Sequence, residues 1–187
     1  MIGHVLSLIR TLIEIILLRK GPEALPRAPV VIVFSAALWL LASIVALVVV
    51  ENYTGNTFLL GIVIGVIGFM IYALLVNAAG KGARLLQTLS AIIGCGAVLS
   101  FAVLICEAVL PYVLNEVQVR AIITLIWLWS VPVEGHIIAR AINRLWYVGF
   151  FAAATVFVVQ LFLLASLGPT LDPRPQQALD QATTQAT

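Results

Sequence analysis

Residues 30–50 read VVIVFSAALWLLASIVALVVV and carry no charged side chain. A helix of about 20 apolar residues is long enough to cross the hydrocarbon core of a bilayer. The two serines of the stretch, Ser35 and Ser43, do not argue against a span, because a serine hydroxyl can bond to a carbonyl of its own helix. The stretch therefore predicts a transmembrane helix, which indicates that the chain is a membrane protein.

Four further apolar segments follow the first one. They cover residues 58–79, 89–110, 119–138 and 146–167. Of the 187 residues, 63% are hydrophobic and only 10% are charged, which lies far outside the range of soluble domains. We therefore predict an all-α fold, a polytopic membrane helix bundle with five transmembrane helices, preceded by an N-terminal interfacial amphipathic helix.

The fourth segment is ambiguous by length, since only the thirteen residues AIITLIWLWSVPV lie between Arg120 and Glu134. The distribution of positive charge favours a span. With five spans and a cytoplasmic N-terminus, eight of the ten Lys and Arg residues lie on the cytoplasmic side, against seven if this segment stays outside. We therefore expect a multi-pass membrane protein, with a cytoplasmic N-terminus and an external C-terminus.

The two flanks differ in composition from the spans. In VLSLIRTLIEIILL, residues 5–18, polar side chains recur at three- and four-residue spacing, which is typical of a helix at a membrane interface. The glycine and prolines of RKGPEALPRAP, residues 19–29, end that helix. We divide the chain into an interfacial helix with a Pro-rich juxtamembrane hinge (residues 1–29), a five-span membrane domain (30–168) and a disordered tail (169–187).

Several function classes find no support in the sequence. A net charge of +2 without clustered Lys and Arg does not favour a nucleic-acid partner. Cys95 and Cys106 are eleven residues apart in one apolar segment, so they neither pair within that helix nor form a metal or redox motif. The motifs of hydrolases, kinases and intramembrane proteases are missing. We expect a protein without catalytic residues, metal or cofactor.

A stripe of small residues runs along the second segment. Gly61, Gly65, Gly68 and Tyr72 recur at spacings of four, three and four, which places them on one helix face. Such a face lets another helix approach closely. The approaching helix could belong to the same chain or to another chain, and the face could alternatively line a substrate pathway.

Three isolated polar residues lie inside the spans. Asn77 and Gln160 can hydrogen-bond between helices, for packing or for transport. Glu107 lies about one turn from the end of the third segment, where a charge costs less than at the bilayer centre. It could be an interfacial carboxylate, a proton- or cation-handling site, or the partner of Arg120.

The densest polar group is in WSVPVEGHIIARAINRLW, residues 129–146. We predict that the fourth helix continues through this segment as an amphipathic turn at the cytosolic surface. Its polar residues form a candidate docking site for a partner protein or acidic lipid head groups. They are Glu134, His136, Arg140, Asn143 and Arg144. Solvated or snorkelling side chains, or proton relay by Glu134 and His136, are the alternatives.

The order of these parts resembles the Yip-domain family of small five-span membrane proteins. The resemblance is carried by the N-terminal helix, the segment LLRKGPEALPRAP, five closely spaced spans and the segment LIWLWS before a short basic loop. It implies a cytosolic N-terminus and an external or lumenal C-terminus, and in eukaryotic members the binding of Rab-type GTPases and a part in vesicle trafficking. The short N-terminal region is more similar to that of bacterial members, so the resemblance implies a location in a bacterial inner membrane.

Two functions are consistent with these features. We expect a non-enzymatic membrane scaffold or assembly factor that binds a membrane-protein partner, or a second copy of itself, through its helix faces and basic cytosolic surface. The alternative is a small transporter or channel subunit. Transport requires Asn77, Glu107, Glu134 or Gln160 to meet in one cavity, whereas a scaffold leaves them on separate faces.

Overall fold

The computed structural model describes residues 2–50 and 53–171, and the side chains of residues 5–50 and 53–168. Six α-helices and no strand occur in these ranges, so the prediction of an all-α fold is confirmed for the described residues. The helices are α1 (Ile2–Ile16), α2 (Pro29–Val49), α3 (Gly55–Ala78), α4 (Leu85–Val109), α5 (Glu116–Ile142) and α6 (Trp146–Leu171). Residues 172–187, where most of the predicted disordered tail falls, lie outside the described residues.

The five helices from α2 to α6 are long and apolar enough to cross a membrane. The ambiguous fourth segment is one continuous helix, α5, of 27 residues, with Pro132 in its interior. The prediction of five long apolar helices is therefore confirmed, and the chain is compatible with a multi-pass membrane protein. α5 and α6 extend beyond the predicted limits of 119–138 and 146–167.

Local signals set the ends of these helices. Asn115 begins α5 with a capping box, in which its side chain accepts from the Gln118 backbone at 3.0 Å and the Gln118 side chain accepts from the Asn115 backbone at 3.2 Å. Asn143 ends α5 in the left-handed conformation, with φ of 54°. The predicted helical face that continues through Asn143 and Arg144 is therefore wrong, because the helix stops at Ile142.

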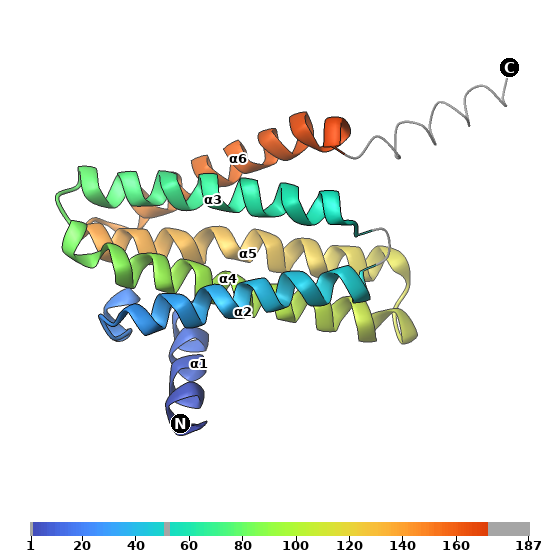
Figure 1. Cartoon of the computed structure of the whole chain (residues 1–187), viewed down its shortest axis with the longest axis horizontal. Coiled ribbons are helices and arrows are strands. Elements are labelled where there is room, and N and C mark those ends of the chain that lie inside the picture. Colours follow the sequence, from blue (N-terminus) through green and yellow to red (C-terminus); the bar gives the residue numbers. More distant parts are fainter. Residues whose placement is uncertain (1, 51–52, 172–187) are drawn as a thin grey trace, which may run out of the picture.

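Helices α2 to α6 run side by side, whereas α1 crosses them at a steep angle (Figure 1). α4 is central and packs against α1, α2 and α5, and α5 packs against α6. α3 packs mainly on α6 and touches α2, its predecessor in the chain, only slightly. α3 is therefore largely separated from α2 and α4, its neighbours in sequence, whereas α4, α5 and α6 pack in sequence order.

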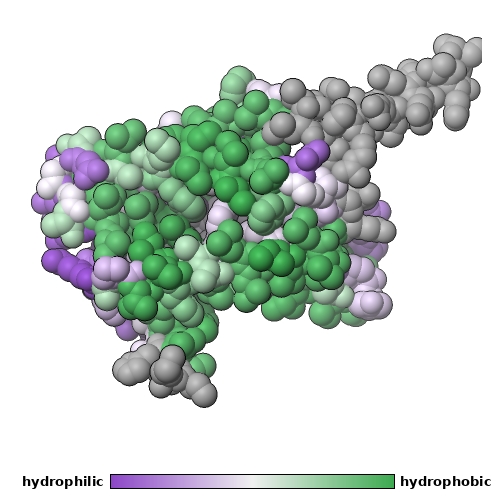
Figure 2. All heavy atoms as spheres, in the orientation of Figure 1, coloured by the Kyte–Doolittle hydropathy of each residue, from purple (hydrophilic) through white to green (hydrophobic). Residues whose placement is uncertain are grey.

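The bundle has two polar ends and an apolar middle (Figure 2). Arg84, Arg140, Asn143 and Arg144 lie together where α5 ends and α6 begins, and we call this end the basic end. Large apolar side chains such as Phe162 (70% exposed) face outward from the middle. An outward apolar surface is what a lipid environment favours, because no water is available there to select polar side chains.

α1 contributes directly to the core. Leu12 and Ile15 are fully buried against the rest of the bundle. The Trp129 indole N–H donates to the carbonyl of Ile16 at 3.1 Å, and the Cys95 thiol approaches the carbonyl of Leu12 at 3.7 Å. The second half of this helix, predicted as an interfacial segment, is thus held by α4 and α5.

Candidate functional site

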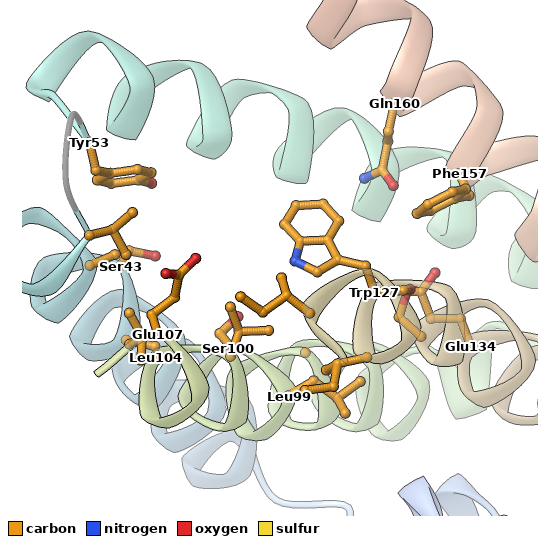
Figure 3. Close-up of a pocket in the computed structure, with 18 residues that line it drawn as sticks. Ser43, Tyr53, Leu99, Ser100, Leu104, Glu107, Trp127, Glu134, Phe157 and Gln160 are labelled. Atoms are coloured by element: carbon orange, nitrogen blue, oxygen red, sulfur yellow. The ribbon is translucent and has the colours of Figure 1, made fainter. Parts of the chain in front are cut away.

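A cavity of about 560 Å³ lies between the helices and is partly open to the surface. Its walls come from α2, α4, α5 and α6 and from the turn that carries Tyr53 (Figure 3). Three residues that the sequence marked as polar candidates, Glu107, Glu134 and Gln160, share this cavity. The structure therefore meets the geometric requirement for the transport alternative with three of its four named residues.

Glu134 lies on α5, eight residues before the helix ends and thus about 12 Å from the basic end. The Tyr72 hydroxyl on α3 donates a hydrogen bond to its carboxylate across 2.5 Å. Tyr72 itself is buried, at 2% exposure. Glu134, which we predicted on a docking surface, therefore faces the interior of the bundle.

Glu107 lies two residues before the end of α4, at the opposite end of the cavity from Glu134 (Figure 3). Neither carboxylate has an ion-pair partner within the described part of the chain. Arg120, one of the predicted partners of Glu107, instead pairs with Glu116 at 2.5 Å on the surface. The cavity thus has a carboxylate toward each of its ends and no basic side chain among the residues that line it.

Gln160 links α6 to α3. Its side-chain amide donates to the carbonyl of Ile64 at 3.4 Å. A Cβ atom on Gly68 would collide with the same amide, so a larger residue there would displace the end of the Gln160 side chain. Gln160 consequently combines a packing role with a place in the cavity wall.

Aromatic and hydroxyl side chains complete the wall. Tyr53, Trp127 and Phe157 contribute rings, and the Trp127 indole projects between the two carboxylates (Figure 3). Burial raises the pKa of the Tyr53 phenol above its ordinary value, so its hydroxyl stays neutral. Ser43 and Ser130 also line the cavity, although their hydroxyls donate to carbonyls of their own helices at 3.0 and 2.7 Å. Sequence patterns do not identify the three aromatic residues, because apolar spans carry no periodicity that distinguishes an inward ring from a lipid-facing one.

The residues of the small-residue stripe contact different neighbouring helices. Gly68 and Tyr72 are buried, and Gly65 faces the Trp39 ring of α2, where a Cβ atom would lie at 3.3 Å. Gly61 is exposed. The stripe therefore contacts several helices of the same chain instead of presenting one uniform face.

A close crossing of α5 and α6 has no counterpart in the sequence prediction. Gly135 of α5 packs against Gly149 of α6. A Cβ atom added to Gly135 would lie 2.7 Å from Cα of Phe150. A Cβ atom on Gly149 would lie 2.6 Å from the backbone nitrogen of Ala139. Two single glycines on different helices do not form a stripe, so only the packed structure identifies this contact.

The other predicted docking residues line the basic end, away from the cavity. Arg140 pairs with Glu23 of the hinge at 2.8 Å, and the His136 ring contacts the carbonyl of Lys20 at 3.2 Å. Asn143 accepts from Arg84 at 2.8 Å. The contacts of Glu23 and Lys20 hold the hinge against α5, and that of Arg84 ties the turn before α4 to the end of α5.

Asn77 and Arg144 do not join the cavity either. Asn77 is exposed near the end of α3, beside Gly82. Arg144 is exposed between α5 and α6. Within the described ranges, no three His, Cys, Asp or Glu side chains are grouped so that they could hold a metal ion.

Comparison with known proteins corrects the predicted family. A family model described as Protein of unknown function (DUF2530) matches residues 20–89, which contain the hinge, α2, α3 and the start of α4. The resemblance to Yip-domain proteins was wrong, because this segment includes most of the hinge sequence that carried it and matches DUF2530. Apolar helices and a proline-containing hinge fit many membrane proteins equally well. No curated protein and no solved structure matches the chain.

Proposed function

We propose that the chain is a multi-pass protein of a bacterial inner membrane that binds a small organic cation in its intramembrane cavity and transports it. The observation that carries the proposal is the convergence of Glu107, Glu134 and Gln160 on one cavity of about 560 Å³. That volume is typical of small-molecule sites, which span roughly 300–1,000 Å³. The N-terminus is proposed to be cytoplasmic and the C-terminus external, because the basic end then faces the cytoplasm.

The charge of the cavity wall supports a cationic ligand. A carboxylate inside a membrane is costly, by about 2.5–3.5 kcal/mol at the centre of a span on insertion scales, unless an opposite charge or a hydrogen bond compensates it. Tyr72 supplies one hydrogen bond to Glu134, but no Lys, Arg or His lines the cavity. A bound cation supplies the missing positive charge, whereas an anion would be repelled.

The rings of the wall favour a quaternary or otherwise weakly hydrated ammonium group. Trp127, Tyr53 and Phe157 present aromatic faces or edges to the same space as the carboxylates. Aromatic rings attract such cations through their negative faces, by about 2 kcal/mol or more when the site is desolvated. A strongly hydrated metal ion would gain less here, since the wall offers few free oxygen ligands.

The scaffold function has less support from the geometry. It relied on the small-residue stripe of α3 as a surface for another protein, but Gly65 and Gly68 are already packed against Trp39 and Gln160 of the same chain. The basic end remains available for a partner through the exposed side chain of Arg144. A partner protein at that end, or a second copy of the chain, is compatible with transport and does not replace it.

Uptake into proteoliposomes tests the proposed function. We expect purified protein to accumulate radiolabelled tetramethylammonium when a negative-inside potential is imposed, and Glu134→Gln to reduce the rate by about tenfold or more. Glu116→Gln is the matched control, because Glu116 is an exposed carboxylate paired with Arg120 away from the cavity. Uptake equal to that of protein-free liposomes, or equal loss in both variants, would contradict the proposal.

A further inference from the structure

A second cavity, of about 250 Å³, adjoins the first cavity of about 560 Å³. Residues of α2 and α3 contribute to its wall, whereas no residue of α3 lines the first cavity. The two cavities share five residues in their walls. These are Gly96, Trp127, Glu134, Phe157 and Gln160.

The chemistry of the second cavity differs from that of the first. Apart from the shared residues, its wall consists of two aromatic side chains, five aliphatic side chains and two glycines. Trp39, Gly61 and Leu164 represent these three groups and come from α2, α3 and α6. No hydroxyl, amide or charged side chain lies beyond the junction, so this space suits an apolar group and not a second ion.

The junction between the cavities has room for a ligand. A Cβ atom added to Gly96, which lines both cavities, would meet nothing within 4 Å. The Trp127 indole lies between the Glu107 side chain and the Gln160 side chain (Figure 3). Glu134 belongs to both walls, so a cation beside it is adjacent to the apolar space.

We propose that the two cavities form one amphipathic site, whose ligand is an organic cation that carries an apolar group. The cationic head lies beside Glu134, and the apolar group fills the cavity between Trp39, Gly61 and Leu164. This inference rests on the proposed cation binding and adds the class of substrate. An aryl or short alkyl group attached to a quaternary ammonium has the required shape, because burial of its apolar surface adds to the charge interaction.

Two probes with the same head separate the contributions of the cavities. Tetramethylammonium has only the cationic head, and benzyltrimethylammonium carries one phenyl group in addition. We measure the binding of both to the full chain in nanodiscs, with protein-free nanodiscs subtracted to remove partition into lipid. We expect the benzyl compound to bind about tenfold more tightly or better, since a phenyl group gains this much from burial.

A substitution that fills the second cavity gives the decisive test. Gly61→Leu adds a side chain to the wall of that cavity, and its Cβ would meet only the Tyr53 hydroxyl, at an ordinary 3.7 Å. We expect this variant to lose the tenfold preference while its affinity for tetramethylammonium changes by less than about twofold. Val63→Leu is the matched control, because Val63 is exposed on the same helix and lines neither cavity. Leu164→Trp repeats the test from α6 if Gly61→Leu fails to fold.

The possible results distinguish the amphipathic site from the proposed cation binding. Equal binding of both probes by the unchanged protein overturns the amphipathic site and leaves cation binding intact, as expected if a lipid chain fills the second cavity. A preference that survives in both Gly61→Leu and Leu164→Trp also overturns it. Failure of both probes to bind overturns the proposed function together with this inference.

Discussion

The hydroxyl of Tyr72 on α3 donates a hydrogen bond to the carboxylate of Glu134 on α5, across 2.5 Å and 62 positions of sequence. The sequence patterns marked Tyr72 as a packing residue and Glu134 as part of a surface docking site. Their contact instead orients a carboxylate at the wall of two cavities. A hydrogen bond contributes about 0.5–1.5 kcal/mol, or about 1.5–3 kcal/mol when one partner is ionised, so this contact holds the Glu134 carboxyl group in position.

We predict that Tyr72→Phe lowers both the stability of the protein and its affinity for cations. Loss of the hydroxyl leaves one oxygen of Glu134 without its donor, which costs about 1–3 kcal/mol. The midpoint of thermal unfolding in detergent should fall, and binding of tetramethylammonium should weaken several-fold. Tyr147→Phe is the control, because Tyr147 is 53% exposed near the basic end. Equal stability and equal affinity of the two variants would exclude the orienting role of Tyr72.

We predict that Gly149→Ala separates α5 from α6. The added Cβ would lie 2.6 Å from the backbone nitrogen of Ala139, and a backbone atom cannot rotate away as a flexible side chain can. Overpacking of this kind costs about 1–3 kcal/mol, although alanine recovers part of this through its higher helix propensity. Thermal unfolding should therefore begin at a lower temperature.

Gly96→Ala is the matched control for this substitution. Gly96 is also a helical glycine, but nothing lies within 4 Å of its added Cβ. Only the gain in helix propensity applies there, so stability should stay constant or rise. Similar unfolding temperatures for the Gly149 and Gly96 variants would indicate that the α5–α6 crossing is not as tight as described.

We predict that acid weakens the attachment of the hinge to α1. The Lys20 ammonium donates to Glu14 at 2.7 Å and lowers the pKa of this carboxyl below its usual 4.5. A lowered pKa means that the stabilisation is complete above the usual value and is lost as the pH falls through the lowered one. The unfolding temperature of the unchanged protein should exceed that of Lys20→Met near pH 6, and the difference should vanish in acid. A difference of the same size that persists in strong acid would assign the effect to the lysine stem.

We predict opposite locations for the two ends of the chain. A fluorescent protein fused before Met1 should fluoresce in the cytoplasm, and alkaline phosphatase fused after Thr187 should be active outside it. The physical reason is the retention of the basic end on the cytoplasmic side. Reversal of Arg140 and Arg144 to Glu should produce a mixed orientation, whereas Arg120→Glu at the other end should not. Both reporters active in one compartment would contradict the orientation.

Much of the fold could be predicted from local sequence. Residues 30–50 predict α2 nearly to the residue, since an uncharged apolar run of this length has few alternatives. α5 was harder, because Arg120 and Glu134 shorten its apolar run to thirteen residues. The structure accommodates both charges by directing Glu134 to Tyr72 and pairing Arg120 with Glu116 at the polar end of the helix. A hydropathy pattern does not contain either contact.

The candidate site could be predicted only as separate polar residues. Glu107, Glu134 and Gln160 were each conspicuous, because a polar side chain in an apolar span is rare. Trp127 and Tyr53 were not, since aromatic residues are common both inside helix bundles and at lipid surfaces. The pairing of α3 with α6, instead of with α2, brings Tyr72 and Gln160 to the same region.

Contiguous stretches of sequence suffice to set the helical content, the number of long apolar helices and the concentration of positive charge toward one end. These properties depend on the composition of contiguous residues and on the cost of placing backbone and charges in lipid. Only the packed bundle shows which helices touch, which glycines allow close crossings and which polar side chains meet in the cavity. Those outcomes depend on contacts between residues that are distant in the chain, and apolar helices pack in many orders with similar burial of surface.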